Sequence, residues 1–114
     1  GDMIWQKTIG GSTFDASRAA CNAQEGGFFV VGSSRSVDGD IAINQGQNDA
    51  LIIKVSDSGN LEWHKTIGGS NIDFFYGVAQ LNNGNVIDVG DSMISDGDII
   101  ENKGFTDALI VEIQ

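Results

Sequence analysis

The sequence predicts an all-β protein made of two copies of one unit. The first observation is an internal repeat: residues 5–12, WQKTIGGS, recur 58 positions later as residues 63–70, WHKTIGGS. The second is a series of Gly- and Asn-containing turn signals between short apolar runs, and the third is that 16 glycines occur without any proline. Together these features favour many short strands over helices.

The repeat extends through the whole unit without a gap. The same offset of 58 places DGDI of residues 38–41 on residues 96–99 and DALI of residues 49–52 on residues 107–110. Each loop has therefore kept its length, and both copies are expected to share one backbone. We interpret residues 1–114 as a single repeat domain, with repeat 1 at about 1–58 and repeat 2 at about 59–114.

Each unit is expected to contain four short strands. In the first copy they are predicted near residues 16–24, 27–34, 50–55 and 60–67. The sequences EGG at 25–27 and NGN at 83–85 predict hairpin turns, because Gly and Asn accept positive φ at little cost. A further turn is predicted at residues 56–60, SDSGN, and a long connection contains residues 38–48.

The strand compositions favour sheets that are covered on both faces. FFVV at 28–31 and LII at 51–53 are continuous apolar runs rather than the alternation of a sheet with one wet face. A β-propeller blade, a four-stranded antiparallel sheet packed between two neighbours, provides this cover, whereas a two-sheet sandwich covers one face of each sheet. The predicted fold is two four-stranded antiparallel β-propeller blades.

The order of the strands predicts a circular permutation. The chain begins in the strand that contains Trp5, a blade's fourth, and ends at Ile113 in the equivalent of a third. The ring is then expected to close by homo-oligomerisation, with the Trp5 strand of one chain added to the edge at Leu109 to Ile113 of the next. Two, three or four chains would make four, six or eight blades, and three is favoured. The competing interpretation is that further repeats of a longer parent chain complete the ring.

The motifs resemble those of a known group of proteins. The pattern combines Trp-x-Lys-x-x-Gly-Gly-Ser, an Asp three residues later, Gly-x-x-x-x-x-Gly-x-Ser, Asp-Gly-Asp and Asp-Ala-Leu-Ile. It is similar to the β-propeller repeats of bacterial secreted and cell-surface proteins, and the similarity covers nearly the whole chain. The resemblance implies a propeller fold and an extracellular or cell-envelope location, and it implies no particular activity.

Charge and hydropathy exclude two classes of partner. The chain carries 16 Asp and Glu against 6 Lys and Arg, a net charge of −10. Nucleic acids and anionic membranes bind clustered Lys and Arg, so we expect no nucleic-acid partner. No apolar run approaches the roughly 20 residues of a membrane-spanning helix, so no membrane insertion is expected.

A repeated group of acidic residues is the strongest candidate for a metal site. Oxygen ligands in a glycine-containing loop suit Ca²⁺, and no other cofactor is indicated. The competing interpretation is that Asp-Gly-Asp forms a tight turn whose carboxylates accept backbone N–H groups, while the later Asp fixes the entry to a buried strand. The candidate ligands are Asp38, Asp40, Asn44, Asp49, Asp96, Asp98, Asn102 and Asp107.

The remaining candidate side chains favour packing over chemistry. Trp5 and Trp63 would suit a sugar-stacking platform, but their equivalent places in the two repeats favour packing between sheets. His64 is the one histidine and aligns with Gln6, which favours a surface strand residue. Cys21 is the one cysteine and aligns with a small residue, which favours a buried filler over a nucleophile. No catalytic residue is assigned.

Two functions from different classes remain. The favoured hypothesis is a non-catalytic binding or scaffolding module of a bacterial secreted or surface protein, with a glycan or a protein as its partner. The alternative is an enzyme with its site in the central channel of the propeller. A unique ligand site would lie where the repeats differ, and three such differences are Arg35 against Met93, Arg18 against Tyr76, and Val30 against Asp88.

Overall fold

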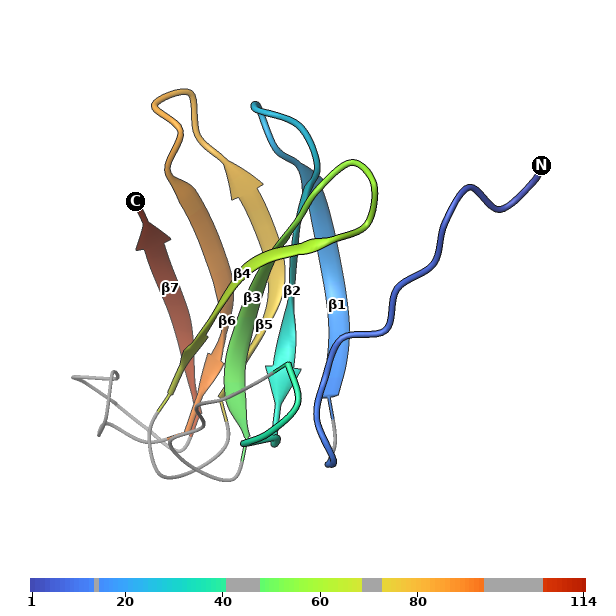
Figure 1. Ribbon diagram of the computed structural model, residues 1–114. Helices are drawn as coiled ribbons and strands as arrows, with labels where there is room; N and C mark the ends of the chain where they lie inside the picture. Colours follow the sequence, from blue (N-terminus) through green and yellow to red (C-terminus); the bar gives the residue numbers. More distant parts are fainter. Residues whose placement is uncertain (14, 41–47, 69–72, 94–105) are drawn as a thin grey trace.

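The computed structural model describes residues 1–13, 15–40, 48–68, 73–93 and 106–114. Within these residues the chain forms two antiparallel sheets, four strands in the first and three in the second, and no helix (Figure 1). The first sheet has the order β1(Asp15–Asn22), β2(Phe28–Ser34), β3(Asp49–Val55) and β4(Leu61–Ile67). The second sheet has the order β5(Asp73–Gln80), β6(Val86–Ser92) and β7(Asp107–Ile113).

Both sheets are simple meanders in which each strand pairs with the next one along the chain. In the first sheet Val31 lies opposite Ile52, and Ile52 lies opposite Lys65. In the second sheet Val89 lies opposite Ile110, which is the same register 58 residues later. The all-β prediction and the four strands of the first copy are confirmed, with bounds that differ by one or two residues from the predicted ones.

A β-bulge occurs at the same place in both sheets. The register shifts between Ser17 and Ala19 in the first sheet, and between Phe75 and Gly77 in the second. The strand opposite each bulge carries a glycine, and a Cβ atom at Gly32 would lie 1.8 Å from the carbonyl oxygen of Ala16. The close approach explains why a glycine stands at this point of β2, and Gly90 repeats the arrangement in β6.

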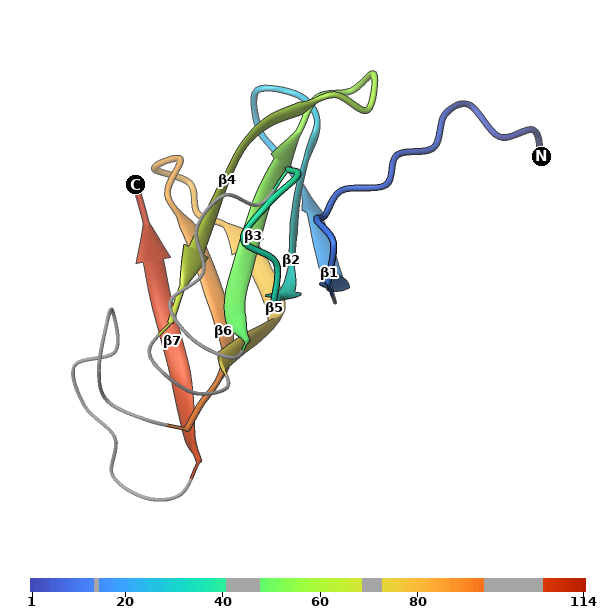
Figure 2. The same cartoon turned by 60° about the horizontal axis from the view of Figure 1, so that its bottom comes forward.

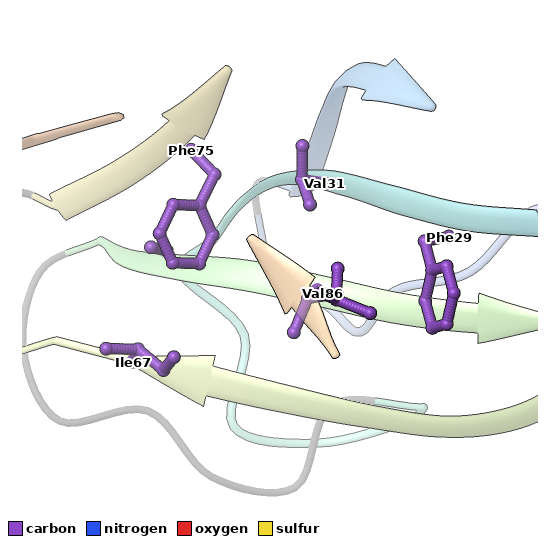
Figure 3. Close-up of a cluster of buried hydrophobic side chains, with 7 residues drawn as sticks. Phe29, Val31, Ile67, Phe75 and Val86 are labelled. Carbon is purple, nitrogen blue, oxygen red and sulfur yellow. The ribbon is translucent and has the colours of Figure 1, made fainter. Parts of the chain in front are cut away.

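The hydrophobic core lies between the two sheets. Side chains of β2 and β4 point toward side chains of β5 and β6, as Figure 3 shows for Phe29, Val31, Ile67, Phe75 and Val86. All seven residues of β3 are buried, because its other face is also covered. Leu51, Ile53 and Val55 form a smaller cluster there, with Ile9 packed against it. The prediction that this apolar run is buried on both faces is confirmed for β3.

The equivalent strand of the second sheet has a different environment. Along β7 half-buried and exposed residues alternate, although its sequence begins with the same four residues as β3. Ile52 is 0% exposed, whereas its counterpart Ile110 is 67% exposed. The second sheet therefore has one buried face and one open face.

The amino-terminal segment, residues 1–13, differs from its prediction. The sequence predicts a strand around Trp5, but residues 1–11 form no strand. The physical reason is that a strand needs a neighbour for its backbone N–H and C=O groups, and this segment lies beside a sheet face instead of a sheet edge. The second sheet has three described strands, as the permuted strand order predicts for a chain that ends in the equivalent of a third strand. Both ribbon views place the two chain termini on opposite sides of the molecule (Figures 1 and 2).

Candidate functional site

The acidic loop of the first repeat binds the amino-terminal segment. The Ser12 N–H donates to Asp38 Oδ1 at 2.7 Å, and the Gly10 N–H donates to Asp40 Oδ2 at 3.1 Å. The Asp40 N–H donates in turn to the Gly10 carbonyl at 2.9 Å. The hydrogen bond from Ser12 to its carboxylate lowers the pKa of Asp38 below the ordinary value. The loop therefore holds Gly10 and Ser12 of the segment from one side.

Asp15, the first residue of β1, also binds the amino-terminal segment. Its Oδ2 accepts the Gly11 N–H at 3.0 Å and the Ser36 hydroxyl at 2.8 Å, and its Oδ1 accepts the Ser34 hydroxyl. Burial by itself raises the pKa of Asp15, but the hydrogen bonds from Ser34, Gly11 and Ser36 outweigh it and hold this pKa below the ordinary value. The carboxylate is thus ionised at neutral pH and stabilises the turn that enters β1. This role was not assigned from the sequence, although Asp15 is the Asp that follows Gly-Gly-Ser by three residues in the repeated pattern.

The eight predicted metal ligands meet different outcomes. Asp38 and Asp40 accept backbone N–H groups, as the turn interpretation expected, and Asp49 and Asp107 begin β3 and β7. Among the described residues no group of three His, Cys, Asp or Glu side chains is close enough together to hold a metal ion. Four of the predicted ligands lie outside the described residues, namely Asn44, Asp96, Asp98 and Asn102.

A groove of about 840 Å³ lies between the amino-terminal segment and the first sheet. Its floor is the face of the sheet that points away from the second sheet, and its lining is mostly aliphatic and aromatic. Such a groove has the size and apolar character of a binding site. The residues that form its floor include Ala20, Phe28, Val30, Leu51, Ile53 and Val55.

Trp5 forms one wall of the groove. Its Nε1 donates to the Asp57 carbonyl at 2.9 Å, and its ring lies 6.4 Å from the ring of Phe28. The indole also covers Gly59, where a Cβ atom would lie 2.7 Å from Trp5 Cε3. Trp5 and Trp63 are each 39% exposed, so the packing predicted for them leaves part of each side chain accessible. Each ring contacts a phenylalanine ring in a tilted arrangement.

Asp88 is a buried acidic residue that the sequence analysis noted only as a difference between the repeats. Asp88 on β6 is 0% exposed, and neither of its carboxylate oxygens has a hydrogen-bond partner within the described part of the chain. Burial raises the pKa of Asp88 to about 7. Val30 occupies the equivalent position in the first sheet, so the substitution of an acid for an aliphatic residue was the available signal.

The two residues weighed for catalysis lie apart from the groove's polar groups. Cys21 is a free thiol packed against the inter-sheet core, and burial, together with the nearby Asp88 carboxylate, raises its pKa. A raised pKa leaves little thiolate at neutral pH, which agrees with a filler residue. His64 lies on β4 opposite Ile53, and its Nδ1 is buried without a hydrogen-bond partner among the described residues. It is therefore less exposed than the surface position predicted for it.

Comparison with known proteins found no family model that matches this chain and no curated protein that matches it. A search of the described residues found no helix of the length and apolarity needed to cross a membrane. What the chain does is therefore argued from its own geometry.

Proposed function

We propose that the chain is a non-catalytic scaffolding or binding module, made of two β-propeller blades that associate with further blades through their open faces. One observation carries this proposal: the grooved face of the first sheet, which the amino-terminal segment covers in part, and the open face of the second sheet are each equivalent to a face that packs between the two sheets. The floor residues Ala20, Phe28, Leu51, Ile53 and Val55 are equivalent to Val78, Val86, Leu109, Val111 and Ile113, which pack in the inter-sheet core.

The opposite end of the stack supports the same proposal. The first sheet places Phe29, Val31, Ala50 and Ile52 against the second sheet. Their counterparts on the second sheet form its open face and are half-buried or exposed, namely Ile87, Val89, Ala108 and Ile110. The two ends are therefore complementary in the same way as the two sheets that already pack together. Covering an aliphatic side chain of this size contributes roughly 2 kcal/mol, so a stack with open ends favours association.

The proposal includes a binding partner and a cellular location for the module. A closed ring of such blades would offer its loops to a glycan or a protein, in a bacterial secreted or cell-envelope setting that the repeat motifs suggest. The net charge of −10 disfavours nucleic acid as a ligand. Ca²⁺ bound to the Asp-Gly-Asp loops is a further part of the proposal, since oxygen ligands in a glycine-containing loop suit this ion.

Light scattering coupled to size exclusion tests the module. The 12.0 kDa chain should elute as an oligomer, with three copies favoured, and should dissociate on dilution. Ile110→Glu should abolish the oligomer, because it places a charge on the open face at an exposed position. Val37→Glu is the matched control: Val37 is 64% exposed but lies outside the strands, so the oligomer should persist. A folded monomer at every concentration would contradict the proposal.

A further inference from the structure

We infer that residues 3–9 of one copy form the fourth strand of the second sheet of another copy, antiparallel to β7. This inference rests on the proposed function and specifies its partner, which is a second copy of this chain. The inference joins β7, an edge strand of the second sheet, to residues 3–9, whose sequence matches that of β4, the neighbour of β3 in the first sheet.

The first support is the edge itself. β3 is hydrogen-bonded to β2 on one side and β4 on the other, whereas its counterpart β7 has β6 as its one neighbour among the strands that the structure describes. The edge of β7 that faces away from β6 is long, and the strand carries Ile110 and a single charged residue on its open face. An edge of this kind pairs readily with another strand. β7 therefore lacks the neighbour that its sequence equivalent has.

The second support is the identity of the segment. β4 includes Trp63, Lys65, Thr66 and Ile67, and the amino-terminal segment has Trp, Lys, Thr and Ile at the four equivalent positions. In β4 these residues form a regular strand, so the same residues at positions 5–9 are competent to form one. Within a single copy residues 1–11 lie beside a sheet face and form no strand with any described edge.

The third support is that the segment already lies where a fourth strand would lie relative to the sheet that follows it. Ile67 at the end of β4 packs against the second sheet in the inter-sheet core, and Ile9 packs in the same way against the first sheet. A Cβ atom at Gly68 would lie 2.8 Å from Asp73 Oδ2, and one at Gly10 would lie 2.5 Å from Asp15 Oδ2. The segment thus reproduces the contacts of β4 with the following sheet.

The surroundings of Gly68, directly after β4, differ from those of Gly10 in one respect. A Cβ atom at Gly68 would also lie 2.5 Å from Oδ1 of Asp49, the first residue of the neighbouring strand. The equivalent of Asp49 is Asp107, the first residue of β7, and the three nearest atoms to the corresponding point at Gly10 all belong to Asp15. Pairing of the segment with β7 of a second copy would bring Asp107 beside Gly10 and complete the arrangement.

The register follows from β3 and β4. In the first sheet Ala50 lies opposite Ile67, Ile52 opposite Lys65, and Val55 opposite Leu61. Subtracting the repeat offset from β4 and adding it to β3 pairs Ala108 with Ile9, Ile110 with Lys7, and Ile113 with Met3. In this register Glu112 is the diagonal neighbour of Lys7, because it lies two residues beyond Ile110 on the same face of β7. The opposite charges of Glu112 and Lys7 attract each other there.

Cysteine cross-linking tests the register in the full chain, with Cys21→Ala removing the native thiol. Mixing Lys7→Cys chains with Ile110→Cys chains under mild oxidation should give a covalent dimer, because directly opposed residues have Cα atoms about 4.5–5.5 Å apart, within reach of a disulfide. The matched control pairs Thr8→Cys with Ile110→Cys and should give far less dimer, since a shift of one residue turns the side chain to the other face of the sheet. All three positions are solvent-accessible or outside strands, so folding should be retained.

The outcomes separate the inference from the function it rests on. Equal yields from both pairs, or no dimer from Lys7 and Ile110 in chains that light scattering shows to be oligomeric, would overturn the register while the module stands. A disulfide within one chain carrying both cysteines, at the monomer mass, would overturn the exchange between copies. Monomeric chains that also fail to cross-link would overturn both the inference and the proposed function.

Discussion

At the scale of single residues, Asp88 opposes the stability of the fold that contains it. Its carboxyl group lies between the sheets without a hydrogen-bond partner in the described structure, and its pKa is raised from 3.8 to about 7. The folded state then binds more protons than the unfolded state between these two values, so the free energy of unfolding falls as pH rises from about 4 to 7. Each pKa unit corresponds to about 1.4 kcal/mol, which sets the full loss at about 4 kcal/mol.

Replacing Asp88 by valine, the residue at the equivalent position 30, should raise the free energy of unfolding at pH 8 by several kcal/mol. The gain should be smaller at pH 4, where the protonated carboxyl group costs only the burial of a neutral polar group. Urea denaturation at a series of pH values measures this. Asp88→Asn is the control: it removes the titration but leaves a buried amide without a partner, so the slope should vanish with a smaller gain. A slope between pH 4 and 7 that persists in both variants would refute the assignment.

How far the sequence predicted the residues depends on what each one contacts. That Asp38 and Asp40 accept backbone N–H groups agrees with one of the two interpretations of the Asp-Gly-Asp motif. Their donors, Ser12 and Gly10, lie 26 and 30 residues away, however, and could not be predicted from local spacing. The burial of Asp88 could not be predicted, because it depends on the packing of one sheet on another. For the same reason the sequence did not show that Trp5 lies at the rim of a groove.

At the scale of elements, the amino-terminal segment is attached chiefly by hydrogen bonds from its backbone. Asp38→Ala removes the acceptor for the Ser12 N–H, so the segment should detach more often and trypsin should cleave after Lys7 severalfold faster. Glu25→Ala, which removes the same charge from an exposed turn, should leave the cleavage rate unchanged. Both variants are best compared in an Ile110→Glu background, where no second copy protects the segment, with mass spectrometry as the readout.

Calcium bound to the Asp-Gly-Asp loops would change the melting temperature of the protein. If Ca²⁺ binds there, millimolar Ca²⁺ should raise the Tm by linkage, and Asp40→Asn combined with Asp98→Asn should abolish the rise. Identical melting curves in Ca²⁺ and in chelator would leave Asp38 and Asp40 as turn residues alone.

Two glycines in equivalent kinds of turn provide a matched test of the contact between Trp5 and the β3–β4 turn. Gly59 and Gly84 have φ values of 89° and 92°, so an alanine at either position costs about 1 kcal/mol in backbone strain. At Gly84 nothing lies near the added Cβ, whereas at Gly59 the ring of Trp5 does. Gly59→Ala should therefore also shift the fluorescence of Trp5 to longer wavelength, measured with Trp63→Phe, and Gly84→Ala should not. Equal spectra would contradict the contact.

The strands themselves were the most predictable part of the molecule. Their positions follow from turn residues such as Gly26 and Gly84 and from apolar runs, which are local properties of the chain. The bulges opposite Gly32 and Gly90 were not predicted, because an extra residue in one strand is visible only against its partner. The same holds for residues 1–11: their sequence matches β4, but strand structure depends on the presence of an edge.

At the scale of the whole molecule, an ungapped repeat produces two equivalent sheets whose environments differ. β3 is fully buried and β7 is half open, although both begin with Asp-Ala-Leu-Ile. The sequence predicted that both strands are buried on both faces, and the structure confirms this for β3. It could not predict which faces remain open, because that depends on the neighbours present and not on the strand.

The attachment of residues 10–12 by Asp15, Asp38 and Asp40 has a kinetic consequence. A free tail that had to order itself during an encounter would lose conformational entropy at that moment, and productive collisions would be rare. Here the tail is already anchored beside an apolar surface before any second copy arrives. Two copies should therefore meet nearly as preformed bodies, with an association rate limited by orientation and by the repulsion between two chains of charge −10, so that added salt accelerates it.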